Sequence, residues 1–188
     1  MWPLRLAFWF VALLFLNEGA AAATPSPYAG WQGRTIKALS AEQIEDLING
    51  RGMGMALPAE LNGYPGPRHV LELARDLHLR PDQLARTRDL FQDMEAKAIA
   101  LGEQIVAHEA SLDQLFASGT ASAAALQEMT ATLGRLTGEL RAHHLGYHLA
   151  MRDLLDAHQV EMYQRLRGYA ASAPSGRHRH DPSAHGGQ

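Results

Sequence analysis

The sequence of 188 residues contains no cysteine. This absence excludes disulfide bonds, thiolate zinc sites, iron–sulfur clusters and thiol nucleophiles, and also a bacterial lipoprotein anchor, which is attached to a cysteine. Lysine is scarce, and the formal net charge of −3 leaves no basic surplus for binding the phosphates of a nucleic acid. Histidine, by contrast, occurs ten times. Metal binding is therefore the first function to consider.

Long hydrophobic runs are also missing. The longest, residues 6–16, falls well short of the roughly 20 residues that a membrane-spanning helix needs. It follows Arg5 and precedes small residues at 20–23, which is the pattern of a secretory signal peptide cleaved after Ala23; an uncleaved membrane anchor is the alternative. We therefore expect residues 1–23 to direct the rest of the chain out of the cytoplasm, to a compartment where ATP is not available.

Proline and glycine divide the rest of the chain. Residues 24–66 contain an expected leader, a short helix at 41–48 and Gly/Pro-rich loops. Pro67 suits the first position of a helix, and Pro81 breaks or restarts that helix. A last helix is expected at 157–166, followed by a polar, disordered tail at 170–188. The main helical domain is thus predicted to span residues 67–169.

Two long segments share the strongest period in the sequence. Apolar residues recur every seven positions, with a second series three positions later, on both sides of a small-residue break at 117–120. No segment alternates in the manner of a β-strand. These patterns predict an all-α fold built on a long antiparallel helical hairpin with short flanking helices. The series are Leu84, Phe91, Ala98, Ile105, Leu112, Met94, Leu101, His108 and Leu115 before the break, and Leu126, Leu133, Leu140, Tyr147, Leu154, Met129, Leu136, His143 and Ala150 after it.

A pattern that begins with leucine and ends with glutamine occurs at three expected helix starts. Ser40 with Gln43, and Asp156 with Gln159, can each form a capping box, and Pro81 favours helix initiation in the middle copy. Helix initiation alone can account for each copy of the pattern. It does not account for the recurrence of a leucine together with the glutamine in all three copies. The three pairs are Leu39 and Gln43, Leu79 and Gln83, and Leu155 and Gln159.

These copies resemble the L-T-x-x-Q motif of the Spy/CpxP family of periplasmic helical proteins. Segments 140–148 and 163–169 add to the likeness, which covers about residues 28–169. The resemblance implies a bent, all-α cradle formed by a dimer of long hairpins, in which the leucines and glutamines of the motif shape the cradle. It also implies a function among those of the family: ATP-independent folding chaperones, stress-response inhibitors, and zinc-resistance or nickel/cobalt-sensor proteins.

One pair of histidines has the spacing of metal ligands. His144 and His148 are four residues apart on a predicted helix, so both imidazoles lie on one face. Met151 could add a soft ligand, and Glu95 would lie opposite His144 if the hairpin folds about residue 119. The alternative is a pair of partly buried or exposed helix residues with hydrogen-bond partners. Metal-handling members of the family, which use His, Glu and Met on facing helices, favour a site.

The other histidines fall into two groups. His108 and His143 occupy core positions of the seven-residue repeats, where we expect hydrogen-bonded core or dimer-interface residues. His178, His180 and His185 lie in the polar tail, which is predicted either to bind metal ions weakly or to act as a spacer.

The sequence contains no recognisable group of nucleophile, base and orienting residue, so an enzyme is not expected. The first interpretation is a periplasmic, ATP-independent chaperone or envelope-stress adaptor. It would form a homodimer, bind unfolded or partly folded proteins, require no cofactor and have a membrane-bound sensor as a candidate partner. The alternative is a periplasmic metal-binding or metal-sensing protein that holds Zn(II), Cu(II) or Ni(II).

Overall fold

A computed structural model describes residues 24–169. The chain divides into two units, of which the first ends at Gln32 and the second begins at Gly33. In the first, the rings of Tyr28 and Trp31 meet edge to face at 5.3 Å. A short 3-10 helix, η1 (Trp31–Gly33), lies at the division. All other helices belong to the second unit.

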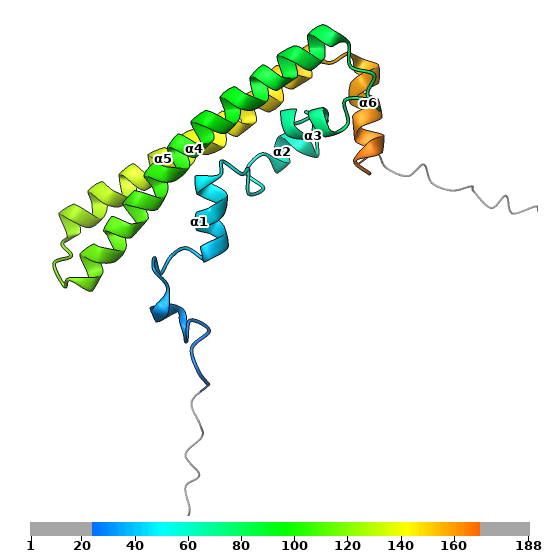
Figure 1. Cartoon of the computed structure of the whole chain (residues 1–188). Helices are drawn as coiled ribbons and strands as arrows, with labels where there is room; N and C mark the ends of the chain where they lie inside the picture. Colours follow the sequence, from blue (N-terminus) through cyan, green and yellow to red (C-terminus); the bar gives the residue numbers. More distant parts are fainter. Residues whose placement is uncertain (1–23, 170–188) are drawn as a thin grey trace, which may run out of the picture. The chain divides into compact units, whose positions relative to one another are not determined.

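The second unit is entirely helical within the described residues, and no strand occurs in residues 24–169. The predicted all-α class is therefore confirmed, and so are the short flanking helices. Two adjacent helices, α4 and α5, are much longer than the others and lie side by side (Figure 1). The helices are α1 (Ala41–Ile48), α2 (Leu57–Glu60), α3 (Pro67–Glu72), α4 (Pro81–Ala117), α5 (Ala123–Leu154) and α6 (Ala157–Leu166).

The hairpin of α4 and α5 turns where the sequence predicts. Gly119, with φ of +69°, follows α4 in the left-handed region that glycine adopts without strain. The Ser122 hydroxyl then accepts a hydrogen bond from the Ala125 amide and caps α5. Between the two long helices, the His143 ring lies 3.1 Å from the Met94 carbonyl oxygen. This contact confirms the register expected for a hairpin folded about residue 119.

The shorter helices lie along and across the hairpin. Helices α1, α2 and α3 follow one another along its length, and α6 crosses its open end (Figure 1). None of the helices in residues 24–169 combines the length and apolar character that a membrane-spanning segment requires. The fold therefore places a series of short elements against one long helical pair.

Two apolar clusters stabilise this arrangement. The tip-side cluster joins α1, α4 and α5, and the junction-side cluster joins α3, α4, α5 and α6. Burying such side chains contributes about 1.5–3 kcal/mol each. The tip-side cluster contains Leu47, Ala98, Leu101, Ile105, Leu133, Leu136 and Leu140. The junction-side cluster contains Val70, Leu77, Leu90, Met151, Leu155, Val160 and Tyr163.

A glycine allows α1 to approach the hairpin closely. Gly102 of α4 is buried, and a Cβ atom at this position would collide with the carbonyl oxygen of Leu47 at the end of α1. Only a residue without a side chain lets the two backbones meet here. Farther toward the tip, Lys37 and Asp113 form an ion pair at 3.0 Å.

Candidate functional site

The second and third copies of the motif meet at the open end of the hairpin, through Gln83 and Gln159. Their side-chain amides exchange two hydrogen bonds, with Gln83 Nε2 2.9 Å from Gln159 Oε1 and Gln159 Nε2 3.0 Å from Gln83 Oε1. Both side chains are buried. We call this pair the glutamine junction.

Each glutamine of the junction also bonds to the backbone at the start of its own helix and to a backbone carbonyl elsewhere in the chain. Gln83 Oε1 accepts from the Arg80 amide, and its Nε2 donates to the Leu154 carbonyl at the end of α5. Gln159 Oε1 accepts from the Asp156 amide, and its Nε2 donates to the Leu77 carbonyl. Every donor and acceptor of the two amides is thereby used, which is the condition under which buried polar groups stabilise a fold.

The leucines of the motif support the junction from the apolar side. Leu155 is buried in the junction-side cluster, and Leu79 packs against that cluster. The first copy of the motif lies elsewhere: Leu39 packs against the tip-side cluster, and the exposed Gln43 makes only the capping box with Ser40. Sequence reasoning identified the caps correctly but missed the direct pairing of two copies.

A cavity of about 390 Å³ lies beside the hairpin, between the two apolar clusters. Its walls come from the loop that follows α1, from α2, α3, α5 and the first half of α4, and from the segment after α6. His144 and His148 both face it, as their spacing on one helix predicts. Its lining includes Glu60, Gly66, Phe91, Met94, Glu95, His144, His148 and Arg167.

His148 is oriented by the backbone. Its Nδ1 lies 2.7 Å from the carbonyl oxygen of Tyr64, so Nδ1 carries the hydrogen and donates it. The lone pair of the neutral ring is then on Nε2. A Cβ atom at Gly66 would lie 3.1 Å from this Nε2 and 3.6 Å from Oε2 of Glu60, so the missing side chain at Gly66 keeps this corner of the cavity open.

His144 lies one turn before His148 and is 3% exposed. Its Nε2 is buried without a hydrogen-bond partner among the described residues. Burial, followed by the proximity of His143 and His148, lowers the pKa of His144 to about 4. The ring is therefore neutral near pH 7.

A buried carboxylate connects α2 to the end of the chain's helical part. Tyr163 of α6 donates to Oε1 of Glu60 at 2.6 Å, and Arg167 Nε lies 3.5 Å from the same oxygen, close enough for an ion pair. Burial and the hydrogen bond to Glu60 raise the pKa of Tyr163, so its hydroxyl stays protonated and donates. The other oxygen, Oε2, is buried without a hydrogen-bond partner in residues 24–169.

The residues predicted as metal ligands are only partly brought together. His144, His148 and Glu95 line the same cavity, but Met151 is fully buried in the junction-side cluster and does not line it. In residues 24–169, no group of three or more His, Cys, Asp or Glu lies close enough to hold a metal ion. Metal binding thus stays a prediction.

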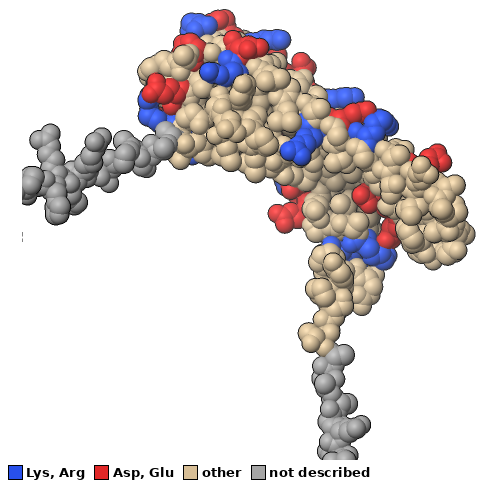
Figure 2. Space-filling view, turned by 180° about the vertical axis from the view of Figure 1, so that it is seen from behind, with Lys and Arg blue, Asp and Glu red and all other residues tan. Residues whose placement is uncertain are grey.

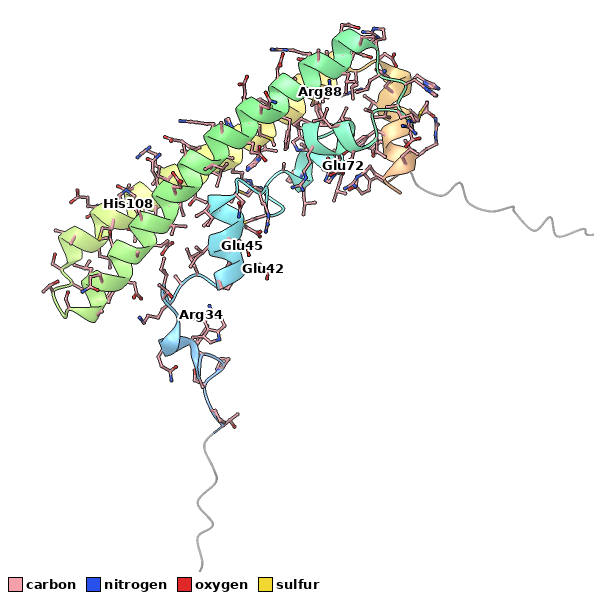
Figure 3. All side chains as sticks on the ribbon, viewed as in Figure 1. Arg34, Glu42, Glu45, Glu72, Arg88 and His108 are labelled. Atoms are coloured by element: carbon pink, nitrogen blue, oxygen red, sulfur yellow. The ribbon has the colours of Figure 1, made fainter. Side chains whose placement is uncertain are left out.

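The remaining histidines occupy separate places. His143 is half-buried and bonded to the Met94 carbonyl, as expected for a core histidine with a partner. His108 is half-buried and lies farther along α4 toward the tip (Figure 3). His178, His180 and His185 lie outside the described residues, and so do the predicted signal peptide and tail.

Glu60 was missed by sequence reasoning. It belongs to α2, a helix of four residues that begins with Leu57 and Pro58 and was expected to be loop. Pro58 near the start of this segment was the one available local indication of a helix. The burial of Glu60 depends on Tyr163 and Arg167, which are more than 100 residues away, so no local pattern reveals it.

Comparisons with protein families, with curated proteins and with solved structures find no match to this chain.

Proposed function

We propose that this protein is a periplasmic chaperone or stress adaptor of the Spy/CpxP kind, which binds unfolded or partly folded proteins without ATP. The observation that carries the proposal is the glutamine junction. Two copies of the motif resembling L-T-x-x-Q, 76 positions apart, meet there through reciprocal hydrogen bonds. The two glutamines therefore bind each other in addition to capping their own helices, which supports a shared structural role for the two copies of the motif.

The surface of α5 supports binding to another protein chain. Gly134, Gly138 and Gly146 are exposed on this helix, and a Cβ atom at any of them would meet nothing within 4 Å. Each glycine destabilises a helix by about 1 kcal/mol relative to alanine. No close packing within the described chain requires a glycine at these positions. A surface without side chains lets another backbone approach closely.

Charged side chains are distributed unevenly over the surface of the molecule (Figure 2). Seen from behind, Lys, Arg, Asp and Glu side chains gather along the outer edge of the hairpin, and the broad face below that edge carries few of them (Figure 2). The exposed Leu149 of α5 adds an apolar side chain. A partner bound at the glycines of α5, whether a client or a second copy of the chain, would cover small and apolar groups and would also meet the exposed Arg135 and Arg141, which lie three residues before and after Gly138.

Suppression of aggregation tests this function. The protein has no cysteine, so a reductant that unfolds a disulfide-containing client such as α-lactalbumin leaves the protein itself intact. We expect metal-free protein, at substoichiometric amounts and without ATP, to reduce light scattering by the reduced client. Unchanged scattering at a molar excess of the protein would contradict the proposal.

A matched pair of variants locates the binding surface. Gly138→Glu adds a negative charge to the face of α5, and Ala107→Glu adds the same charge to an exposed position of α4. We expect Gly138→Glu to lower the suppression of aggregation several-fold and Ala107→Glu to leave it unchanged. Equal effects of the two substitutions would show that the face of α5 is not the binding surface.

A further inference from the structure

The cavity beside the hairpin contains buried polar atoms that have no hydrogen-bond partner among the described residues. They are Glu60 Oε2, His144 Nε2 and Arg167 Nε, of which Glu60 Oε2 lies 3.7 Å from His148 Nδ1 and Arg167 Nε lies 3.5 Å from Glu60 Oε1. Glu95, half-buried on the cavity wall, forms no hydrogen bond or ion pair with any residue of 24–169. Leaving a buried polar atom unpaired costs about 1–3 kcal/mol, which a ligand that supplies the missing partner would recover.

The charges around the cavity indicate the sign of that ligand. Every arginine on the wall, together with His69 and His148, already lies near a carboxylate, whereas the carboxylate of Glu95 faces no base within the described residues. A cation is therefore favoured over an anion. The pairs are Arg51 with Asp46 at 2.7 Å, Arg68 with Glu72 at 3.4 Å, His69 with Glu72 at 2.8 Å, Arg167 with Glu60 at 3.5 Å, and His148 with Glu60 at 3.7 Å. Glu72 projects from α3 (Figure 3).

The spread of the unpaired atoms indicates the size of the ligand. A metal ion needs its ligands within about 2.0–2.6 Å of one point, and no three carboxylate or imidazole side chains in residues 24–169 converge in this way. The volume of about 390 Å³ is instead that of a small organic molecule. Phe91 and Met94 add apolar wall to the cavity.

We propose that this cavity binds a small organic cation in which an apolar stem carries several N–H donors, as in an alkylguanidinium ion. The carboxylates of Glu60 and Glu95 accept hydrogen bonds from the cationic group. The neutral imidazole of His144 accepts another through Nε2, and Phe91 and Met94 contact the stem. This binding site is independent of the chaperone surface on α5 and goes beyond the proposed function.

Isothermal titration of the full chain with butylguanidinium and with butylurea, its neutral isostere, tests the charge requirement. For a ligand of this size we expect one site with a Kd on the order of 1 mM or below. Butylurea, which lacks the charge, is expected to bind at least about tenfold more weakly. Equal affinities of the two compounds, or no binding of butylguanidinium, would overturn the proposal.

Substitutions then locate the site. Glu95→Gln removes the charge of a half-buried wall residue and is expected to weaken butylguanidinium binding about tenfold. Glu103→Gln makes the same change at an exposed position two turns further along α4 and is expected to have no effect. Circular dichroism checks that both variants fold. Equal affinity in the two variants would show that the cation binds elsewhere.

Two further titrations exclude other occupants. Zn(II) that binds with submicromolar Kd, and that loses this affinity in His144→Ala, would make the cavity a metal site and overturn the proposal. A blocked peptide with one arginine that binds more tightly than butylguanidinium would assign the cavity to an arginine of a protein. Weaker binding of both probes than of butylguanidinium supports a free organic cation.

Discussion

The junction-side and tip-side clusters are both built from leucines and other apolar residues, but different contacts complete them. Around the junction-side cluster, Gln83 and Gln159 tie the starts of α4 and α6 to the end of α5 and to the turn after α3 through directed hydrogen bonds. Around the tip-side cluster, α1 is positioned by shape, because the Leu47 carbonyl packs directly against Gly102. One end of the hairpin thus depends on buried hydrogen bonds and the other on close packing. Buried hydrogen bonds lose more when one partner is removed, so we expect substitutions at the junction to have the larger effects.

The largest effect is expected from Gln83→Ala. This substitution removes the partners of the Arg80 amide, the Leu154 carbonyl and half of the Gln159 amide, and it leaves a cavity among buried groups. We expect the free energy of unfolding to fall by about 4 kcal/mol, measured by urea denaturation. The control is Gln43→Ala, which removes an exposed capping interaction and should cost about 1 kcal/mol. Equal losses in the two variants would remove the distinction between the junction and an ordinary helix cap.

The next largest effect on the free energy of unfolding is expected from pH, through protonation of His144, which lies between the two clusters. Burial, with the neighbouring His143 and His148, lowers the pKa of His144 from 6.5 to about 4. As the pH falls, the unfolded chain therefore binds a proton at this residue before the folded chain does. The contribution of His144 is constant above pH 6.5, decreases by up to about 3 kcal/mol between pH 6.5 and 4, and then levels off.

Denaturation at a series of pH values measures this contribution. We expect His144→Leu to lose most of the slope between pH 6.5 and 4, and His158→Leu, at an exposed position of α6, to retain it. If His144→Leu has the slope of the unaltered protein, the ring is not held neutral by burial.

The smallest effects are expected from two identical substitutions on the long helices. Gly102→Ala introduces a Cβ atom against the Leu47 carbonyl and should destabilise the protein by about 2 kcal/mol, mainly by displacing α1. Gly138→Ala meets no neighbouring atom and should stabilise it by about 1 kcal/mol, because alanine favours the helix. Thermal denaturation distinguishes the two signs. A gain in both variants would show that α1 does not pack on Gly102 as described.

Local sequence patterns were sufficient to predict most of the helices. The expected helices at 41–48 and 157–166 have the bounds of α1 and α6, and Pro81 begins α4 as predicted. The helix expected after Pro67 ends earlier than its apolar pattern suggests, since α3 stops at Glu72 and His78 adopts a positive φ of 49°. Repeats, caps and prolines act over a few residues, which is why they determine helix limits well.

The candidate sites required contacts that no local pattern contains. The positions of His144 and His148 on one face followed from helical spacing alone. The burial of Met151 did not, because its surroundings include Val70 of α3, which is distant in sequence. The pairing of Gln83 with Gln159 was hidden for the opposite reason: helix capping already gave each glutamine a sufficient role.

The length of the hairpin gives the glutamine junction a mechanical consequence. Helix α4 has 37 residues and therefore extends about 55 Å from its start at the junction. With such a lever arm, a rotation of about 5° between α6 and the hairpin displaces the tip by roughly 5 Å. Because the two amides of the junction fix the angle between α6 and the hairpin, a small change in their geometry would move the far end of the helical pair by several ångströms.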